Sequence, residues 1–562
     1  MSSTRPVTFA LRWRTIASSA LLLAVLVSPS PVVAHGNVPV VAHGNVMASQ
    51  ASTVTPPSQA ERSSASTDRI DDGLLLDGVG AGLPSDGTPS RPTRDVRAIL
   101  RTQSDATGTS GSLRTTAFPA FATLGYVQQS VPRAAHPYAL ASAVPIDDTG
   151  IHDADGVRMI RIGTTLFDHP VAQAQYGLAN VASFDLTDDQ RFLDRAIAQA
   201  TRLVDDKVVS RGAWYFPYPF DFALHGRATE TLRAPWYSAM AQGMALSLFV
   251  DLYERTNDDA WLAAATGTVA SFRNGPQAGM PWVTHIDDAG YLWLEEYPAD
   301  PPNTSDFTLN GHMFATFGLF DYATLTGDPL TTLLFDGGVT TARRYGGAFA
   351  PDGFRTQAWL SAYCLRHHVL DVKYHSIVTN QFIAVHSVTA DALFARVSDA
   401  YRADYPEGLR STVRFAAGTW TGYVFDSKGR IVRSKAVRFS RASTAPSDRY
   451  TRIKGRGLYY HITAGSLKGY WIAERAERVH ATGQYETARY YPSRTAVFPV
   501  GRTVGYRFDA NGIRNTSRSV SLSAKSSAPF DQTAMFGGRR YTRINAGTLT
   551  GYWVPTAAVT LR

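Results

Sequence analysis

Apolar residues recur with helical spacing from about residue 164 onward, in segments separated by short loops. Three of these segments are TDDQRFLDRAIAQATRLVDD, WYSAMAQGMALSLFVDLYERT and NGHMFATFGLFDYATLTGD, which begin at Thr187, Trp236 and Asn310. Apolar side chains return every three to four residues in such segments, as they do in helices. Thr187 and Gln190 have capping-box spacing, so we expect Thr187 to cap a helix. Helices joined by short loops predict an α/α barrel, or toroid, over residues 164–415.

Short alternating pieces such as VRMIRIG precede the helical region and predict a small β region over residues 116–163. Within it, HDADG (152–156) resembles the start of a calcium-binding loop. The closing glutamate of an EF-hand would fall at position 164, which is a threonine. Two interpretations stay open here, a structural calcium ion and an Asp-rich turn.

Helical periodicity disappears beyond about residue 417, and a tandem repeat begins. GYVFDSKGRI at 422 returns as GYRFDANGIR at 505, and ITAGSLKGYW at 462 returns as INAGTLTGYW at 544. Gly-rich turns between short aromatic strands predict two small all-β modules, at 417–490 and 491–562. The motifs AGSLKGYW and AGTLTGYW resemble those of the SH3-like, Gly-Trp-type modules that attach secreted bacterial proteins to their envelope.

The N-terminal part has a different pattern. Arginines precede the apolar run at 16–27, and small residues suited to cleavage follow it, which predicts a signal peptide at 1–34 and a secreted protein. An uncleaved anchor is the alternative, although the run is short for a bilayer span. Residues 35–115, rich in Ser, Thr, Pro and Gly, predict a disordered linker. At 562 residues, the whole chain is predicted to be multidomain.

Charge divides the chain into two parts. From residue 417 to the end there are 24 Lys and Arg against 7 Asp and Glu, a net charge of +17, whereas the whole chain carries +8. The basic repeats are therefore expected to bind an anionic envelope polymer, and secretion argues against a nucleic-acid partner. The single cysteine, Cys364, excludes an intramolecular disulfide. No phosphate loop, nucleotide fingerprint or Cys/His spacing predicts an organic cofactor or a metal centre.

Six ordered sequence blocks lie between about residues 164 and 395. They are FDHPVAQAQYGLANV, WYSAMAQG, EEYP, FTLNGHMFATFGLFDY, YCLRHH and YHSIVTNQ. Together they resemble the C-terminal domain of D-glucuronyl C5-epimerases. The resemblance implies an isomerase that inverts C5 of glucuronate within a heparosan-like acidic polysaccharide, on an α/α barrel preceded by β elements.

The resemblance implies catalytic roles for Tyr297, Tyr363, Tyr374 and Arg366. C5–H lies beside a carboxylate, so its removal adds charge that a cation must stabilise, and Arg366 is the candidate. Inversion needs an acid/base on each face of the ring, and Tyr297 and Tyr374 are the expected pair, with Tyr363 as the alternative partner. A nearby guanidinium is expected to lower the pKa of a tyrosine from about 10.

Glu295 and Glu296 are adjacent, and adjacent side chains of a strand point to opposite faces. We expect Glu296 to orient or deprotonate its neighbours and Glu295 to face solvent or a structural partner. The second set of candidates, for substrate binding, is Asn310, His367, His375, Tyr237, Trp236 and Gln242. Cys364 departs from the resembled pattern, which commonly has Asp there, and this leaves substrate detail open.

Two other functions compete with the epimerase. A polysaccharide lyase forms the same C5 carbanion and then expels the O4 group, so only an unsaturated product separates the two. A wall-attached glycan-binding protein without activity would suit the basic repeats equally well. A glycosidase fits less well, because it needs two carboxylates about 5 to 9.5 Å apart across the bond, and the conspicuous pair here is adjacent.

Overall fold

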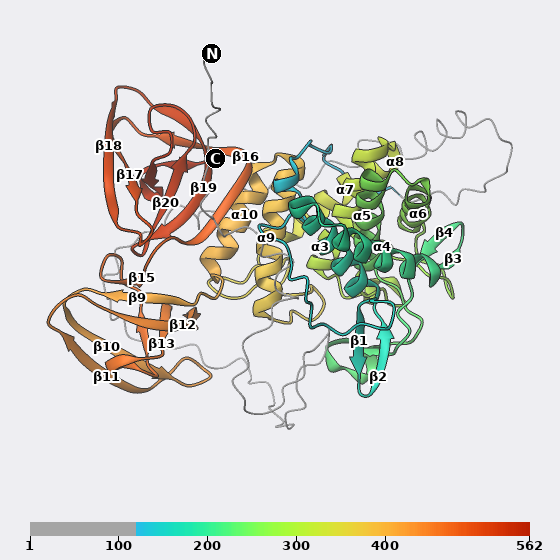
Figure 1. Cartoon of the computed structure of the whole chain (residues 1–562), viewed down its shortest axis with the longest axis horizontal. Helices are drawn as coiled ribbons and strands as arrows, with labels where there is room; N and C mark the ends of the chain where they lie inside the picture. The colour runs from blue at the N-terminus through green and yellow to red at the C-terminus, as the bar shows by residue number, and fades with distance from the viewer. Residues whose placement is uncertain (1–119) are drawn as a thin grey trace, which may run out of the picture.

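A computed structural model of the chain describes residues 120–562, so the predicted signal peptide and linker lie outside the described residues. Within them, eight α-helices follow one another as four antiparallel pairs (Figure 1). The pairs are α3 (Pro170–Thr187) with α4 (Gln190–Asp205), α5 (Ala239–Thr256) with α6 (Asp259–Val269), α7 (Leu309–Thr326) with α8 (Pro329–Gly346), and α9 (Val372–Thr389) with α10 (Ala392–Asp404).

Short polar side chains cap several helices and so determine where they begin. Asp189, rather than Thr187, caps α4 by accepting from the Arg191 amide, so the predicted capping residue was wrong by two positions. Thr187 instead belongs to the last turn of α3. The closest helix packing is between α5 and α7. A Cβ on Gly243 would overlap Ala315, and one on Gly318 would overlap Gly243, so only glycine permits this approach.

Residues 120–562 also contain four two-stranded antiparallel sheets next to the helices in sequence. They are β1 (Met159–Ile162) with β2 (Thr165–Asp168), β3 (Val208–Ser210) with β4 (Ala213–Tyr215), β5 (Phe222–Ala223) with β6 (Thr231–Leu232), and β7 (Thr284–Ile286) with β8 (Leu292–Leu294). Just before β1, the Asp153 carboxylate accepts from the Asp155 and Val157 amides and pairs with Arg202 of α4. These contacts are those of an Asp-rich turn; calcium binding there stays a prediction.

The C-terminal region contains two sheets of seven antiparallel strands each (Figure 1). The first comprises β9 (Ser411–Phe415), β10 (Gly418–Phe425), β11 (Ile431–Phe439), β12 (Ser443–Ile453), β13 (Gly457–Ile462), β14 (Trp471–Ala473) and β15 (Val479–Ala481). The second comprises β16 (Tyr485–Phe498), β17 (Gly501–Phe508), β18 (Arg514–Leu522), β19 (Ser526–Phe536), β20 (Arg539–Ile544), β21 (Trp553–Pro555) and β22 (Thr560–Leu561).

These sheets correct the predicted fold class. A helical barrel followed by two small SH3-like modules was wrong, because each C-terminal unit is a seven-stranded antiparallel sheet in which only some strands are long. The order β11-β10-β14-β13-β12-β9-β15 recurs as β18-β17-β21-β20-β19-β16-β22, as expected for a tandem repeat. Strands β11 and β18 are exposed along most of their length, so they lack the alternation that reveals a strand in a sequence.

The second sheet packs against α9 and α10 through polar contacts. Arg494 of β16 is 2% exposed and pairs with Asp399 of α10 across 2.6 Å. The Tyr490 hydroxyl donates to the same carboxylate across 2.5 Å, and a ring nitrogen of His386 on α9 lies 3.0 Å from the Pro492 carbonyl oxygen. The basic region is thus docked on the helices. Over residues 120–562, no helix has both the length and the apolar character needed to cross a membrane.

Candidate active site

The adjacent glutamates follow strand β8 and are both buried, with different partners. Glu295 is 0% exposed; it accepts from the Phe307 amide across 3.4 Å and lies 3.7 Å from His285 Nδ1. Glu296 is 2% exposed and accepts from the Tyr363 hydroxyl and from Asn310 Nδ2, each across 3.2 Å. Glu296 lies against the first turn of α7, where Gly311 leaves room for its carboxylate.

Three tyrosines that the sequence singled out gather around Glu296. The hydroxyls of Tyr297 and Tyr363 lie 3.1 Å apart, so Tyr297, Tyr363 and Glu296 form one hydrogen-bonded chain. The Tyr374 ring, in the first turn of α9, packs 4.3 Å from the Tyr363 ring between centroids. Tyr297 and Tyr363 are buried, whereas Tyr374 is half-buried. Tyr374 is therefore the member of the cluster that reaches toward solvent.

Burial sets the protonation of this cluster. It raises the pKa of Glu296 from its ordinary value to about 7, although hydrogen bonds from the neighbouring tyrosines oppose the shift. Burial, and then the charge of Glu296, raise the pKa values of Tyr297, Tyr363 and Tyr374 above the ordinary value. The guanidinium-lowered tyrosine pKa expected from the sequence is wrong in direction. Neutral phenols surround a carboxyl group that titrates near neutrality.

Two cations lie near the cluster, in different settings. Arg366 is exposed; its guanidinium lies 3.3 Å from Glu230 Oε1 and also donates to the Thr304 carbonyl oxygen. Lys373 is half-buried, with its ammonium 5.6 Å from the centroid of the Tyr374 ring. Burial lowers the pKa of Lys373, while Asp371 and Glu296 act in the opposite direction. Lys373 and Glu296 therefore interact electrostatically.

Two of the remaining predicted binding residues, Trp236 and His375, adjoin residues of the cluster. Trp236 donates from Nε1 to the Phe220 carbonyl oxygen across 2.9 Å, and a narrow aromatic pocket beside it is lined by Phe222, Glu296 and Tyr297. His375 accepts from the Ser361 amide across 2.9 Å and so holds the loop before Tyr363.

Two further predicted binding residues contact other parts of the helical region. Gln242 is 0% exposed and contacts the Phe216 amide and the Trp214 carbonyl oxygen at 2.9 and 2.7 Å. Tyr237 packs against Tyr215, with ring centroids 5.5 Å apart.

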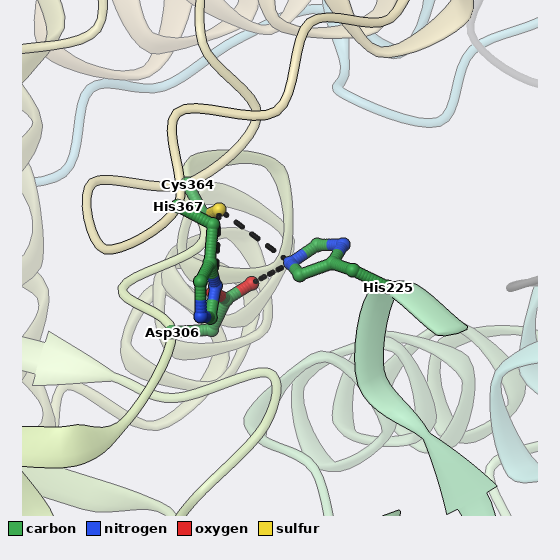
Figure 2. Close-up of side chains that lie close together, drawn as sticks. All are labelled: His225, Asp306, Cys364 and His367. Carbon is green, nitrogen blue, oxygen red and sulfur yellow. Dashed lines mark hydrogen bonds and ion pairs between the residues drawn. The ribbon is translucent and has the colours of Figure 1, made fainter. Parts of the chain in front are cut away.

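A second polar cluster adjoins the tyrosines. His225, Asp306, Cys364 and His367 each present one metal-binding type of atom, and these atoms lie within 4.8 Å of one another (Figure 2). His367 was predicted to bind substrate; it lies here, 2.7 Å from Asp306, rather than beside Glu296. The side chains come from three segments, namely the β5–β6 connection, the loop before α7 and the loop before α9.

Comparison with known proteins bears on the segment that holds both clusters. Residues 210–405 match the D-glucuronyl C5-epimerase C-terminus family. A D-glucuronyl C5-epimerase of Caenorhabditis elegans is 31% identical over 116 residues, which are 20% of this chain and 17% of that protein. An uncharacterised protein of Methanocaldococcus jannaschii is 22% identical over 203 residues, 36% of this chain and 61% of that protein. The chain thus spans less than two thirds of either relative.

The matched segment, residues 210–405, contains Glu296, the three tyrosines and all four residues of the second cluster, and it excludes both C-terminal sheets. These matches support a carbohydrate epimerase domain. Among solved structures, cellobiose 2-epimerase from Bacillus thermoamylovorans aligns with a TM-score of 0.32 at 13% identity, over 49% of this chain and 67% of that one. Likeness at that level establishes neither a shared fold nor a shared activity.

Lys373 and the second cluster are what sequence reasoning missed. The signal for Lys373 was present, because it stands beside Tyr374 in the KYH motif. The second cluster had no comparable signal. Only Cys364 and His367 are close in sequence, and His225 and Asp306 join them through the fold.

Proposed function

We propose that the protein is a uronate C5-epimerase that acts on glucuronate residues of an acidic, heparosan-like polysaccharide. The observation that carries the proposal is the buried hydrogen-bonded chain of Tyr297, Tyr363 and Glu296, with Tyr374 packed against it. The match to the D-glucuronyl C5-epimerase family supports glucuronate as the sugar.

The first chemical requirement is a base that can take the C5 proton. A catalytic base works best when its pKa lies near the operating pH, and burial raises the pKa of Glu296 to about 7. Tyr363 and Tyr297 both interact with that carboxylate, and their hydroxyls lie 3.1 Å apart. In the proposed mechanism Glu296 is the final proton acceptor, and the two phenols relay the proton from the sugar.

Inversion then requires a proton from the opposite face of the ring. Tyr374 suits this role because its raised pKa keeps the phenol protonated and its ring is half-buried. In the proposed mechanism Tyr374 protonates one face of the sugar ring and the Tyr297–Tyr363 relay takes the proton from the other. The Tyr374 ring, which lies 4.3 Å from the Tyr363 ring between centroids, moves aside to admit the sugar. This mechanism retains Tyr297 and Tyr374 as the opposed pair and assigns the base function to Glu296.

The second requirement is a cation for the uronate carboxylate, which gains charge when C5 loses its proton. Arg366 and Lys373 are the two candidates. Lys373 is favoured because it packs over the Tyr374 ring and interacts with Glu296, whereas Arg366 is engaged with Glu230. The aromatic wall of Trp236, Phe222 and Tyr297 would lie against the apolar face of a sugar.

The basic C-terminal sheets would bind an anionic polymer. From residue 417 on, the net charge is +17, which favours either an envelope polymer or the acidic substrate itself. An N-terminal run of signal-peptide type supports a secreted, envelope-associated protein. Docking of the second sheet on α10 through Arg494 and Asp399 would keep such a polymer close to the helical region.

The test is incubation of the full-length protein with heparosan in D₂O, followed by NMR and ultraviolet absorbance. The proposal predicts deuterium at C5, formation of iduronate and no unsaturated uronate. Unsaturated uronate would assign a lyase to the same residues. Absence of both products across a panel of acidic polysaccharides would overturn the enzymatic assignment and favour glycan binding without chemistry.

A further inference from the structure

We propose that His225, Asp306, Cys364 and His367 bind one divalent transition-metal ion, and that their chemistry selects zinc. These residues converge from the β5–β6 connection, the loop before α7 and the loop before α9 (Figure 2). A thiol and two imidazoles are the donors that zinc prefers, whereas calcium and magnesium take oxygen ligands. Four protein ligands would complete a tetrahedral shell, the arrangement of structural zinc sites.

The thiol contacts have separations close to those of a zinc site. Cys364 Sγ lies 3.6 Å from His225 Nε2 and 4.0 Å from His367 Nδ1. With Zn–S near 2.3 Å and Zn–N near 2.0 Å, a tetrahedron separates a thiolate from an imidazole nitrogen by roughly 3.5 Å.

The carboxylate is drawn closer to the imidazoles than a zinc shell requires. Asp306 Oδ2 lies 3.0 Å from His225 Nε2, and Asp306 Oδ1 lies 2.7 Å from His367 Nδ1. Both distances are those of hydrogen bonds. A bound ion would replace these bonds. It would lengthen the distance from Asp306 to His225 by roughly 0.3 Å and to His367 by roughly 0.6 Å, because a tetrahedron of this size needs roughly 3.3 Å.

The hydrogen bonds of His367 supply an independent argument. Its Nδ1 faces Asp306, and its Nε2 lies 3.0 Å from Glu230 Oε2. A neutral imidazole has one N–H, so it can donate to only one of these two carboxylates. With a metal ion on Nδ1, the Nε2 hydrogen donates to Glu230, which is the carboxylate–histidine–metal arrangement of protein metal sites. Glu230 is in turn contacted by Arg366 across 3.3 Å.

Burial suits an ion held by the protein alone. Cys364 and Asp306 are 0% exposed, and the side chains of His367 and His225 are 5% and 13% exposed. In the absence of metal, the alternative is a hydrogen-bonded His–Asp–His group beside the Cys364 thiol. The metal-bound and metal-free forms differ in metal content, so elemental analysis distinguishes them directly.

A metal ion here would position Tyr363, a role that rests on the proposed function. Tyr363 directly precedes Cys364, and its ring lies 5.7 Å from the His225 ring in an edge-to-face contact. Its hydroxyl contacts Glu296 and Tyr297. Binding one ion to three segments would hold the Tyr363 backbone in place, so metal removal is expected to lower kcat and the melting temperature together.

The decisive test measures metal on the full-length protein, without reference to activity. After equilibration with zinc and dialysis, elemental analysis should find about one zinc per chain. Cobalt(II) in its place should produce a thiolate-to-metal charge-transfer band in the near ultraviolet. Cys364→Ser should abolish that band and lower zinc retention at least tenfold.

The matched control is His461→Ala. His461 makes the same 2.7 Å contact with an aspartate, Asp448, but lies partly exposed on β13 of the first sheet. It should leave zinc content and the cobalt band unchanged. A wild-type protein that retains no zinc and shows no thiolate band with cobalt would contradict the proposed metal site. This measurement uses only the wild type, so it does not depend on whether a variant folds. A zinc-containing protein that epimerises no uronate would instead contradict the proposed function and leave the site standing.

Discussion

The Tyr363 hydroxyl donates to Glu296 Oε1 across 3.2 Å, and both side chains are almost completely buried. The contact joins a residue just after β8 to one in the loop before α9, so it depends on the assembled helical region. Burial raises the pKa of the Glu296 carboxylate to about 7. The Tyr363 phenol is hydrogen-bonded to this carboxylate, so a proton can pass between them. Tyr363 and Glu296 are therefore the two residues on which the proposed proton transfer depends most.

Removal of the Tyr363 hydroxyl should abolish most of the epimerisation. Tyr363→Phe keeps the ring but removes the hydroxyl that donates to Glu296, so kcat should fall roughly 100-fold or more, while stability falls by only about 1 kcal/mol. The control is Tyr322→Phe, which removes another buried hydroxyl, 3.1 Å from Thr266 Oγ1. Equal activity losses in the two variants would contradict a relay role for Tyr363.

The rate should depend on the ionisation of Glu296. Because Glu296 acts as a base only when deprotonated, kcat/KM should rise with pH through a midpoint near 7, and Glu296→Gln should remove that dependence and most of the rate. Glu295→Gln is the matched control, because burial also raises the pKa of Glu295 to about 7 but its partners are His285 and Phe307. If Glu295→Gln abolishes the same limb of the profile, the assignment is wrong.

Stability should move in the opposite direction with pH. The folded state holds a proton on Glu296 that the unfolded chain releases above about 4.5, so raising the pH from about 4.5 to about 7 favours unfolding. Relative to Glu296→Gln, the wild type should lose up to about 3 kcal/mol of unfolding free energy across that window. Urea titrations at several pH values measure this difference, and a constant difference would contradict the raised pKa.

Loss of the Lys373 charge should impair turnover of the charged substrate. Lys373→Met should lower kcat/KM by about 100-fold if the ammonium stabilises the uronate carboxylate, and Arg366→Met should have a smaller effect. Lys207→Met is the control, since Lys207 also packs over an aromatic ring, with its ammonium 4.6 Å from the Trp214 centroid, but is remote in sequence from the cluster. A larger loss in Arg366→Met would restore Arg366 as the main cation.

The contact between the second sheet and α10 should contribute to stability. Arg494→Met leaves Asp399 without its guanidinium partner, so the free energy of unfolding should fall by about 3 kcal/mol or more. Arg430→Met breaks an ion pair of the same kind with Asp426, but its side chain is 74% exposed, so the loss should stay below about 1 kcal/mol. A loss of unfolding free energy for Arg494→Met that is as small as that for Arg430→Met would show that the docking contact is not stabilising.

The residues of the Glu296–tyrosine cluster could be singled out from the sequence because they belong to short motifs. EEYP, YCLRHH and KYH place Glu296, Tyr297, Tyr363 and Tyr374 in recognisable contexts, and the fold brings all four together. Helices were likewise visible, because their apolar positions repeat every three to four residues.

Three other features could be recognised only in the three-dimensional structure. The pKa directions could not be read from residue types, since burial and the charge of Glu296 raise the pKa values of the tyrosines. The C-terminal fold was mispredicted because exposed, Arg- and Ser-rich strands such as β18 alternate little between apolar and polar residues. The His225, Asp306, Cys364 and His367 cluster combines three distant segments, so no spacing rule could identify it.

The docking of the second sheet also affects how the protein should be tested. Truncation after the last helix would expose the surface of α9 and α10 that Tyr490 and Arg494 cover, so the full-length chain is the proper enzyme for assay.

The most direct test of the central claim is C5 hydrogen exchange on heparosan in D₂O, followed by NMR, for the wild type and for Glu296→Gln. The account predicts deuterium at C5 together with iduronate for the wild type, and a loss of exchange of at least 100-fold for Glu296→Gln, with Glu295→Gln close to wild type. Exchange that persists in Glu296→Gln, or wild-type protein that exchanges no C5 hydrogen, would contradict it.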